Sequence, residues 1–595
     1  MHADRPIRSR VPRVGSNPLQ PMGRPGIRAV RTRRAVAISD GNPHQSFPIS
    51  LPLAITAMLL WALVAPALAQ TGAGDGGRPP APDNGSDWRS IDGSDNNQSD
   101  SSIGSAGTTL RRLAPADYAD GVSELAGQDR ASARAVSNLV CAQEEDRSNP
   151  VGASDFVWQW GQFVDHDIDL TQGADPAEAA DITVPLGDFW FDPFETGDIT
   201  ISLSRSAWDP TTGGGPDNPR EQINQITAWI DGSNVYGSDE TRAAALRTND
   251  GTGRLRTSDG NLLPFNEDGL SNAGGTSASL FLAGDIRANE QVGLLAMHTL
   301  FVREHNRLAR RFGRRNRNAS GDQIYEMARQ LVGAEIQAIT YKEFLPALLG
   351  PGAIGSWRGY DENIDASIRN EFSTASYRFG HSLLSPTLLR LDRRGNEIEE
   401  GHLSLSDAFF SPQLITDEGG IEPLLRGLAA QLCQTVDPYV VDDVRNFLFG
   451  VPGAGGFDLA ALNIQRGRDH GLPSYNDLRA AYGLPRIQSF TEITSDETTR
   501  MALFAAYGDV DSIDAWVGGL AEDAVPQSMV GPTIEAVLVN QFRVLRDGDR
   551  FWYQGTLSRR DLRYVERMTL AKIIRKNTNI RGRQVQRNVF RVSAP

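Results

Sequence analysis

Apolar positions in this chain mostly follow helical spacing. Apolar residues recur three and four positions apart, which is the spacing that places them on one face of an α-helix. The segments with this spacing are 157–170, 292–314, 323–343, 440–448 and 562–575. The helix that contains 292–314 is expected to begin near Asp285, and strand-like alternation is short, as at 199–203. The pattern predicts a mainly α protein, with a single large helical domain and little β-structure.

Two N-terminal segments depart from this pattern. A basic stretch precedes an apolar run over 51–69 that ends in small residues, which is the order of parts in a signal peptide. Because Pro66 interrupts the run, we expect cleavage, with no stable membrane span afterwards. The predicted parts are therefore a leader and signal peptide (1–69), a Gly/Ser/Asp-rich linker (70–107) and a folded domain (108–595) of a secreted or periplasmic protein.

Charge and cysteine content exclude several classes of function. The net charge of -15 makes nucleic acid an unlikely partner, since phosphate backbones repel an anionic protein. Two cysteines, Cys141 and Cys433, cannot form a disulfide framework or a thiolate cluster, and two unpaired buried thiols are the favoured interpretation.

The segment 160–169 combines apolar residues with a polar face. Gln162, Asp165, His166 and Asp169 lie at helical offsets of three and four, so their side chains share one side of the predicted helix. Burying an amide, two carboxylates and an imidazole together is costly unless they have partners. The alternative is a capped, solvated helix end.

Three other segments carry candidate chemistry. Arg287 and Glu290 are three residues apart, so their side chains would share one face of a helix. They are either a functional pair or an ordinary ion pair on the surface. His381 follows a glycine and lies one turn after Arg378; a neutral imidazole is a common axial ligand of haem iron, although a lone histidine is more often a core residue. Residues with side-chain oxygens alternate over 227–233, so these oxygens could face one calcium ion. The alternative is an ordinary turn.

Together with 339–346, 461–473 and 546–553, these segments resemble the animal haem peroxidase (peroxidase–cyclooxygenase) superfamily, whose members include myeloperoxidase and lactoperoxidase. The resemblance begins in the predicted linker at Arg89 and extends to about residue 575. The leader and the low cysteine content favour a bacterial member. The resemblance implies a haem peroxidase that reduces hydrogen peroxide.

The resemblance also implies roles for individual residues. His166 would be the distal acid and base, Arg287 the distal arginine, and Gln162 a neighbour that holds water or halide. The residues implied to hold haem b are Asp165 and Glu290 through ester links, His381 as iron ligand, Asn463 as acceptor of the His381 ring N–H, and Arg378 and Asp169 near the propionates. The residues implied to bind calcium are Asp167, Thr227, Trp229, Asp231 and Ser233.

One departure from the family bears on the electron donor. Gln291 stands where myeloperoxidase has a methionine that forms a third haem link, so that link should be absent and the protein should resemble lactoperoxidase. Bromide, iodide, thiocyanate or phenols are then the expected donors.

Two alternatives are kept. In the cyclooxygenase branch of fatty-acid dioxygenases the radical tyrosine lies three residues before the proximal histidine, whereas here that position is Arg378 and the tyrosine is Tyr377. A non-catalytic haem-binding adhesion protein is disfavoured by the intact His166 and Arg287. His298, His305 and His470 are expected to be structural and His402 exposed, and the sequence does not indicate the oligomeric state.

Overall fold

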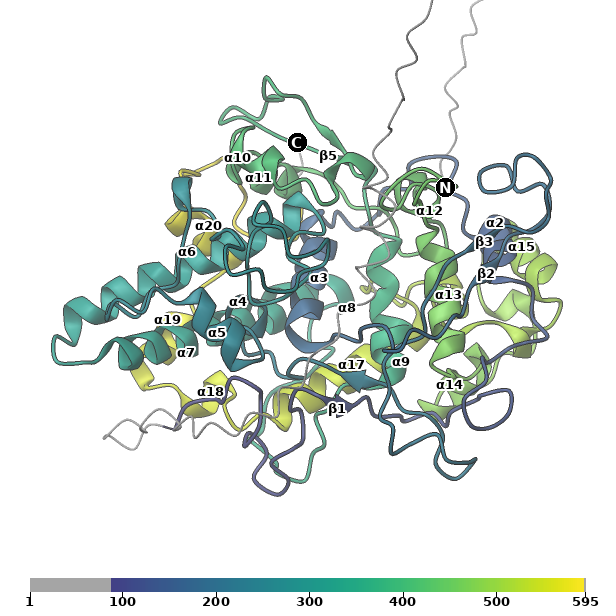
Figure 1. Cartoon of the computed structure of the whole chain (residues 1–595), viewed down its shortest axis with the longest axis horizontal. Helices are drawn as coiled ribbons and strands as arrows, with labels where there is room; N and C mark the ends of the chain where they lie inside the picture. The colour runs from purple at the N-terminus through teal and green to yellow at the C-terminus, as the bar shows by residue number, and fades with distance from the viewer. Residues whose placement is uncertain (1–86, 593–595) are drawn as a thin grey trace, which may run out of the picture. The chain divides into compact units, whose positions relative to one another are not determined.

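A computed structural model of the chain describes residues 87–592 (Figure 1). Helices dominate this part, and its three sheets each have two short antiparallel strands. The predicted mainly α fold is confirmed. The predicted leader and residues 70–86 of the linker lie outside the described residues.

The longer helices are α2 (Ala133–Val140), α3 (Phe156–Ile168), α5 (Glu240–Leu246), α6 (Val292–Arg315), α7 (Gly321–Ile339), α11 (Glu422–Ala430), α13 (Leu459–Asp469), α14 (Tyr475–Ala481), α15 (Glu497–Tyr507), α16 (Ala515–Ala521), α17 (Pro532–Asp547), α19 (Arg559–Val565) and α20 (Leu570–Asn577). The shorter ones are α4 (Ser233–Tyr236), α8 (Leu345–Leu349), α9 (Asn370–Thr374), α10 (Gln413–Thr416), α12 (Asp442–Arg445) and α18 (Tyr553–Thr556). Single turns of 3₁₀ or π type are η1 (Asp259–Asn261), η2 (Thr340–Phe344), η3 (Ser376–His381), η4 (Ser406–Ala408), η5 (Phe490–Glu492) and η6 (Val510–Ser512). The strands pair as β1 (Thr108–Thr109) with β4 (Ile223–Asn224), β2 (Ile182–Thr183) with β3 (Thr200–Ile201), and β5 (Thr387–Leu388) with β6 (Leu403–Ser404).

Several predicted helices differ from the observed ones. The helix expected to begin near Asp285 begins at Val292, because Gln291 is extended and its side-chain oxygen caps the N–H of Gly293. The segment 440–448 contains only the four-residue α12, and 562–575 is divided between α19 and α20. Residues 285–291 are therefore a turn at the N-terminus of α6.

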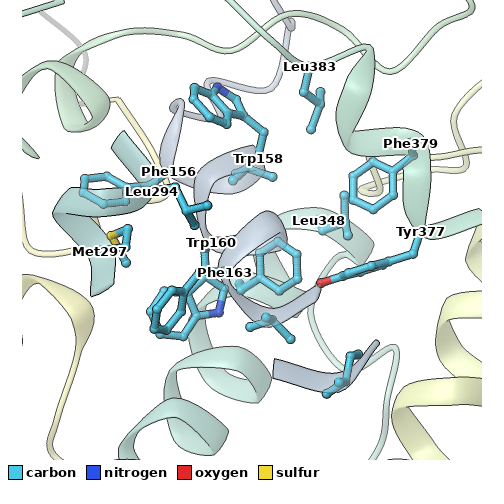
Figure 2. Packing of buried hydrophobic residues seen from close by; sticks show 14 of the residues in the cluster. Phe156, Trp158, Trp160, Phe163, Leu294, Met297, Leu348, Tyr377, Phe379 and Leu383 are labelled. Atoms are coloured by element: carbon cyan, nitrogen blue, oxygen red, sulfur yellow. The ribbon is translucent and has the colours of Figure 1, made fainter. Parts of the chain in front are cut away.

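Helix α3 crosses the hydrophobic core. Trp160 and Phe163 extend from it and pack against Phe301 of α6, with ring centroids 5.7 Å and 5.0 Å from the Phe301 ring. Figure 2 shows Trp160 and Phe163 together with Phe156 and Met297. Burial of each such side chain contributes about 1.5–3 kcal/mol, which fixes the position of α3 and of the polar residues at its C-terminal end.

The described part of the predicted linker packs on the domain. Arg89 pairs with Asp549 at 2.6 Å, Asn96 donates to the same carboxylate at 3.0 Å, and the Trp229 indole donates to the Gly93 carbonyl at 3.0 Å. Residues 87–107 thus contact the folded body although their composition is typical of a linker.

The structure also bears on the cysteines and on membrane spans. Cys141 and Cys433 are both free and buried, as the sequence favoured. No helix within residues 87–592 is long and apolar enough to cross a membrane.

Candidate active site

A cavity of about 520 Å³ lies among the end of α3, the turn before α6, η3 and α13. Its volume is within the range of small-molecule and cofactor pockets. It is lined by all nine residues that the sequence nominated for catalysis or haem binding, namely Gln162, Asp165, His166, Asp169, Arg287, Glu290, Arg378, His381 and Asn463. Four separate segments of the chain supply them.

His166 lies in the last turn of α3 and is almost fully buried. Its Nδ1 is 3.4 Å from Asp285 Oδ1, and its Nε2 is 4.0 Å from Glu290 Oε2. Burial lowers the pKa of His166 well below its usual range, and the neighbouring Arg287 charge lowers this pKa further, against the opposing effect of Asp285. The imidazole is therefore neutral near pH 7 and able to accept a proton.

Arg287 is fixed by a carboxylate that the sequence analysis missed. Asp285 accepts two hydrogen bonds from the Arg287 guanidinium, at 2.9 Å and 2.8 Å, and this charge holds the pKa of the buried Asp285 below its usual range. The guanidinium also donates to the Asp169 carbonyl at 2.8 Å and lies 3.5 Å from Asp165. Asp285 precedes Arg287 by two residues, and residues at this spacing do not share a face of a helix. Only the folded turn shows that Asp285 lies between Arg287 and His166.

Two further carboxyl groups face the cavity in an uncommon ionisation state. Burial raises the pKa of Glu290 to about 7, and burial together with the Asp169 charge raises the pKa of Asp165 well above its usual range. Gln162 donates to Glu290 at 3.1 Å and accepts from Gln291 at 3.1 Å. Gln291 thus both caps α6 and holds Gln162.

His381 ends the turn η3 and faces Asn463 of α13. Burial lowers the pKa of His381 to about 3, so its imidazole is neutral, as iron ligation requires. The hydrogen bond between His381 and Asn463 has the opposite direction to the predicted one. The Asn463 amide nitrogen, which is a donor, lies 2.8 Å from His381 Nδ1, and the Asn463 amide oxygen accepts from Arg378 at 3.2 Å. Arg378 competes for this oxygen, which the spacing of the residues could not show.

Four of the five nominated calcium residues meet at the end of α3. Ser233 donates to Asp167 at 3.1 Å, and its backbone N–H donates to Asp231 at 2.8 Å. Thr227 donates to Asp231 at 3.3 Å. Burial and the proximity of Asp231 raise the pKa of Asp167 well above its usual range, so a cation bound between these two carboxylates would reduce their mutual repulsion. The Trp229 indole points away to Gly93, which leaves only its backbone carbonyl as a candidate ligand.

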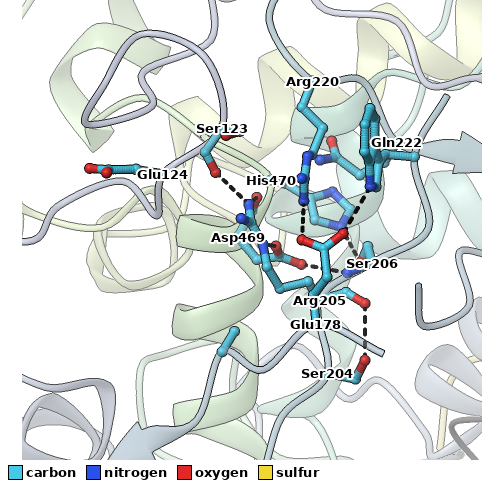
Figure 3. A network of polar contacts seen from close by, with 12 residues as sticks. Ser123, Glu124, Glu178, Ser204, Arg205, Ser206, Arg220, Gln222, Asp469 and His470 are labelled. Carbon is cyan, nitrogen blue, oxygen red and sulfur yellow. Dashed lines mark hydrogen bonds and ion pairs between the residues drawn. The ribbon is translucent and has the colours of Figure 1, made fainter. Parts of the chain in front are cut away.

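Three of the other histidines, His298, His305 and His470, are buried, and His470 also lines the cavity. His470 bonds to Asn370 at 2.7 Å and to Ser206 at 2.7 Å, within the polar network around Asp469 and Arg205 that Figure 3 shows. His298 and His305 are buried in α6. The prediction that His402 is exposed is wrong: it is partly buried, and its Nδ1 accepts from the Arg390 backbone at 3.1 Å.

Comparison with known proteins shows the family of the chain. The family described as animal haem peroxidase matches residues 88–590. The chain belongs to the animal haem peroxidase family. Peroxinectin A of Dictyostelium discoideum is 37% identical over 85% of this chain and 96% of its own length, and human eosinophil peroxidase is 36% identical over 85% and 77%.

A longer relative and two solved structures also match this chain. Drosophila melanogaster peroxidasin is 37% identical, but the match covers 84% of this chain and only 36% of that protein. The structure of peroxidase A from Dictyostelium discoideum aligns with a TM-score of 0.79 at 36% identity, over 85% of this chain and all of that one. An Arabidopsis thaliana fatty acid alpha-dioxygenase aligns with a TM-score of 0.73 at 20% identity, over 85% of this chain and 84% of that one. This likeness shows a shared fold alone.

Proposed function

We propose that this haem peroxidase reduces hydrogen peroxide and oxidises halides, pseudohalides such as thiocyanate, or phenolic donors. The observation that carries the proposal is the meeting of a neutral His166, a fixed Arg287 and a neutral His381 in one cavity. The relatives of similar length include two whose names describe peroxidases.

The residues present fit haem b. His381 would bind the iron through Nε2, which requires the Asn463 amide to turn so that its oxygen accepts the Nδ1 proton. Arg378, released from that oxygen, would pair with a haem propionate near Asp169. Once bound, the haem would supply the redox-active iron that takes up the oxidising equivalents of peroxide and passes them on to the donor.

The chain's own residues supply the proton steps. His166 Nε2 would take a proton from one oxygen of peroxide and give it to the other, which departs as water. Arg287 would stabilise the negative charge that develops as the O–O bond breaks, and Asp285 holds it in place beforehand. Gln162 would position water or halide beside His166.

Asp165 and Glu290 are proposed to form ester links to the haem. Their raised pKa values favour the uncharged carboxyl, which reduces the cost of burying each group in the wall of the cavity. A third link is not proposed, because Gln291 has no sulfur and its amide already holds Gln162. Calcium is proposed for Asp167, Thr227, the Trp229 carbonyl, Asp231 and Ser233, where it would join α3 to the loop before α4.

The N-terminal composition supports the remaining proposals. Residues 1–69 would be a leader and signal peptide that sends the domain out of the cytoplasm, to the periplasm or the medium.

The test is the absorption spectrum of the haem-loaded protein before and after one equivalent of hydrogen peroxide, followed by bromide or a phenol. We expect the Soret band to shift with peroxide and to recover with the donor. An unchanged spectrum would refute the peroxidase proposal and favour a non-catalytic scaffold. Oxygen uptake with a fatty acid, in place of recovery with these donors, would instead support the dioxygenase alternative.

A further inference from the structure

Trp158 is placed where an oxidisable side chain can exchange electrons with the haem. It extends from α3 one turn before Gln162, lines the cavity and is 3% exposed. Among the described residues that line the cavity it is the one tryptophan. Figure 2 shows it beside Leu383, on a different side of α3 from Trp160.

A buried carboxyl group lies next to this indole. Asp155 is the N-cap residue of α3, so Trp158 follows it at the helical offset of three that brings two side chains together. Its Oδ1 accepts from Ser385 at 2.8 Å. Asp155 Oδ2 and Trp158 Nε1 are both buried, and within residues 87–592 neither has a hydrogen-bond partner of ordinary geometry. Buried polar atoms without partners are rare, and these two occur on adjacent side chains of opposite hydrogen-bonding character.

The protonation of Asp155 suits it to exchange a proton with the indole. Burial raises the pKa of this carboxyl to about 8, while contacts with Trp158 and Ser385 oppose the rise. The other titratable group facing it is Cys433, whose pKa burial and the Asp155 charge raise well above its usual range, with Arg591 opposing. Cys433 therefore stays a thiol while Asp155 titrates.

We propose that Trp158 and Asp155 form a redox-active pair that stores one oxidising equivalent of peroxide in the protein. The indole gives one electron to the haem that peroxide has oxidised, and its N–H proton passes to Asp155. This leaves a neutral tryptophanyl radical, a protonated carboxyl and a haem reduced by one electron. A one-electron donor such as a phenolate then returns the electron, and Asp155 returns the proton.

Tyr377, the one tyrosine among the described cavity residues, lacks such a base. Its hydroxyl donates to the Gly161 carbonyl at 3.2 Å, and burial raises the pKa of the phenol well above its usual range. A peptide carbonyl cannot take the phenol proton at neutral pH, whereas the Asp155 carboxylate can take the proton of an oxidised indole. The radical is therefore expected on Trp158.

The experiment is freeze-quench electron paramagnetic resonance of the haem-loaded protein after one equivalent of peroxide, without a donor. The protein is labelled with ring-deuterated tryptophan. We expect an organic radical whose hyperfine pattern responds to the label, and its loss in Trp158→Phe. Trp160→Phe is the matched control: Trp160 lies on the same helix, donates to Thr340 and does not line the cavity, so the signal should persist.

Asp155→Asn tests the proton step. This change keeps the side-chain volume and should abolish or sharply reduce the signal. In the unchanged protein the signal should grow several-fold from pH 7 to pH 9, because a carboxyl with a pKa of about 8 goes from roughly one tenth to roughly nine tenths ionised over this range. After many turnovers, mass spectrometry should find oxygen added to Trp158 in preference to Trp160.

Different failures have different meanings, since this inference rests on the peroxidase function. If peroxide leaves the Soret band unchanged, the peroxidase proposal itself fails. If the Soret band shifts but the radical is insensitive to deuterated tryptophan, or persists in Trp158→Phe, the redox pair is refuted and the peroxidase proposal stands.

Discussion

Asp285→Asn is expected to impair both distal groups at once. Asp285 is 1% exposed at its side chain and holds Arg287 by two hydrogen bonds, with His166 3.4 Å away. The asparagine has nearly the same volume but no charge, and its NH₂ group would face the guanidinium. Arg287 would keep the weaker contact with Asp165 at 3.5 Å and the Asp169 carbonyl.

The magnitudes follow from the loss of one partner of a buried ion pair. Such a loss costs about 3–5 kcal/mol, and we expect the lower end because Asp165 and the carbonyl remain. Loss of one preorganised group that stabilises transition-state charge slows a reaction by roughly 10²–10³-fold, and we expect the rate constant for the reaction with peroxide to fall by about this factor.

Stopped-flow absorption of the haem-loaded protein measures the rate constant directly, and urea unfolding measures the stability. Asp514→Asn is the control, because Asp514 is a similarly buried carboxylate that pairs with Arg468, at 3.1 Å and 2.8 Å, and with Arg130, at 2.8 Å, away from the cavity. It should lose at least as much stability without slowing the peroxide reaction. Asp285→Asn reacting at the unchanged rate, or Asp514→Asn slowing equally, would show that Asp285 does not act on the distal groups.

Three other predictions concern stability, calcium and haem attachment. Burial and the Glu304 charge raise the pKa of Glu335 well above 4.5, so the folded state keeps a proton that the unfolded chain releases, and stability should fall as pH rises above about 4.5 by about 1.4 kcal/mol per pH unit up to the folded-state pKa. Glu335→Gln should lower the slope of stability against pH by about 1.4 kcal/mol per pH unit, the contribution of one proton, in unfolding measured from pH 5 to 8; an unchanged slope would contradict the assignment. Calcium at 100 times its Kd should stabilise the protein by about 2.7 kcal/mol, so a chelator should lower the Tm. The chelator should leave the Tm of Asp231→Asn unchanged. Acidified organic solvent should leave haem on the unchanged protein and extract it from Asp165→Asn/Glu290→Gln; extraction from both would exclude ester links.

The sequence by itself determined the fold class and the nine cavity residues with assigned roles. Helical spacing is a local property, so α3 and α6 could be located from apolar positions to within a few residues. The nine nominated residues line one cavity because the resemblance rests on whole segments, each containing a functional residue at a fixed position. The start of α6 was misplaced because polar residues before Val292 continue the helical pattern, whereas the Gln291 side chain caps the helix there.

Only the tertiary structure decided the partners of these residues. Asp285 is inconspicuous in the sequence, yet the turn before α6 brings it against both Arg287 and His166. The competition of Arg378 with His381 for Asn463 depends on how η3 meets α13, and the pairing of Trp158 with Asp155 depends on where α3 begins. The pKa values that define the chemistry follow from burial and from charges on other segments, and neither is encoded by local spacing.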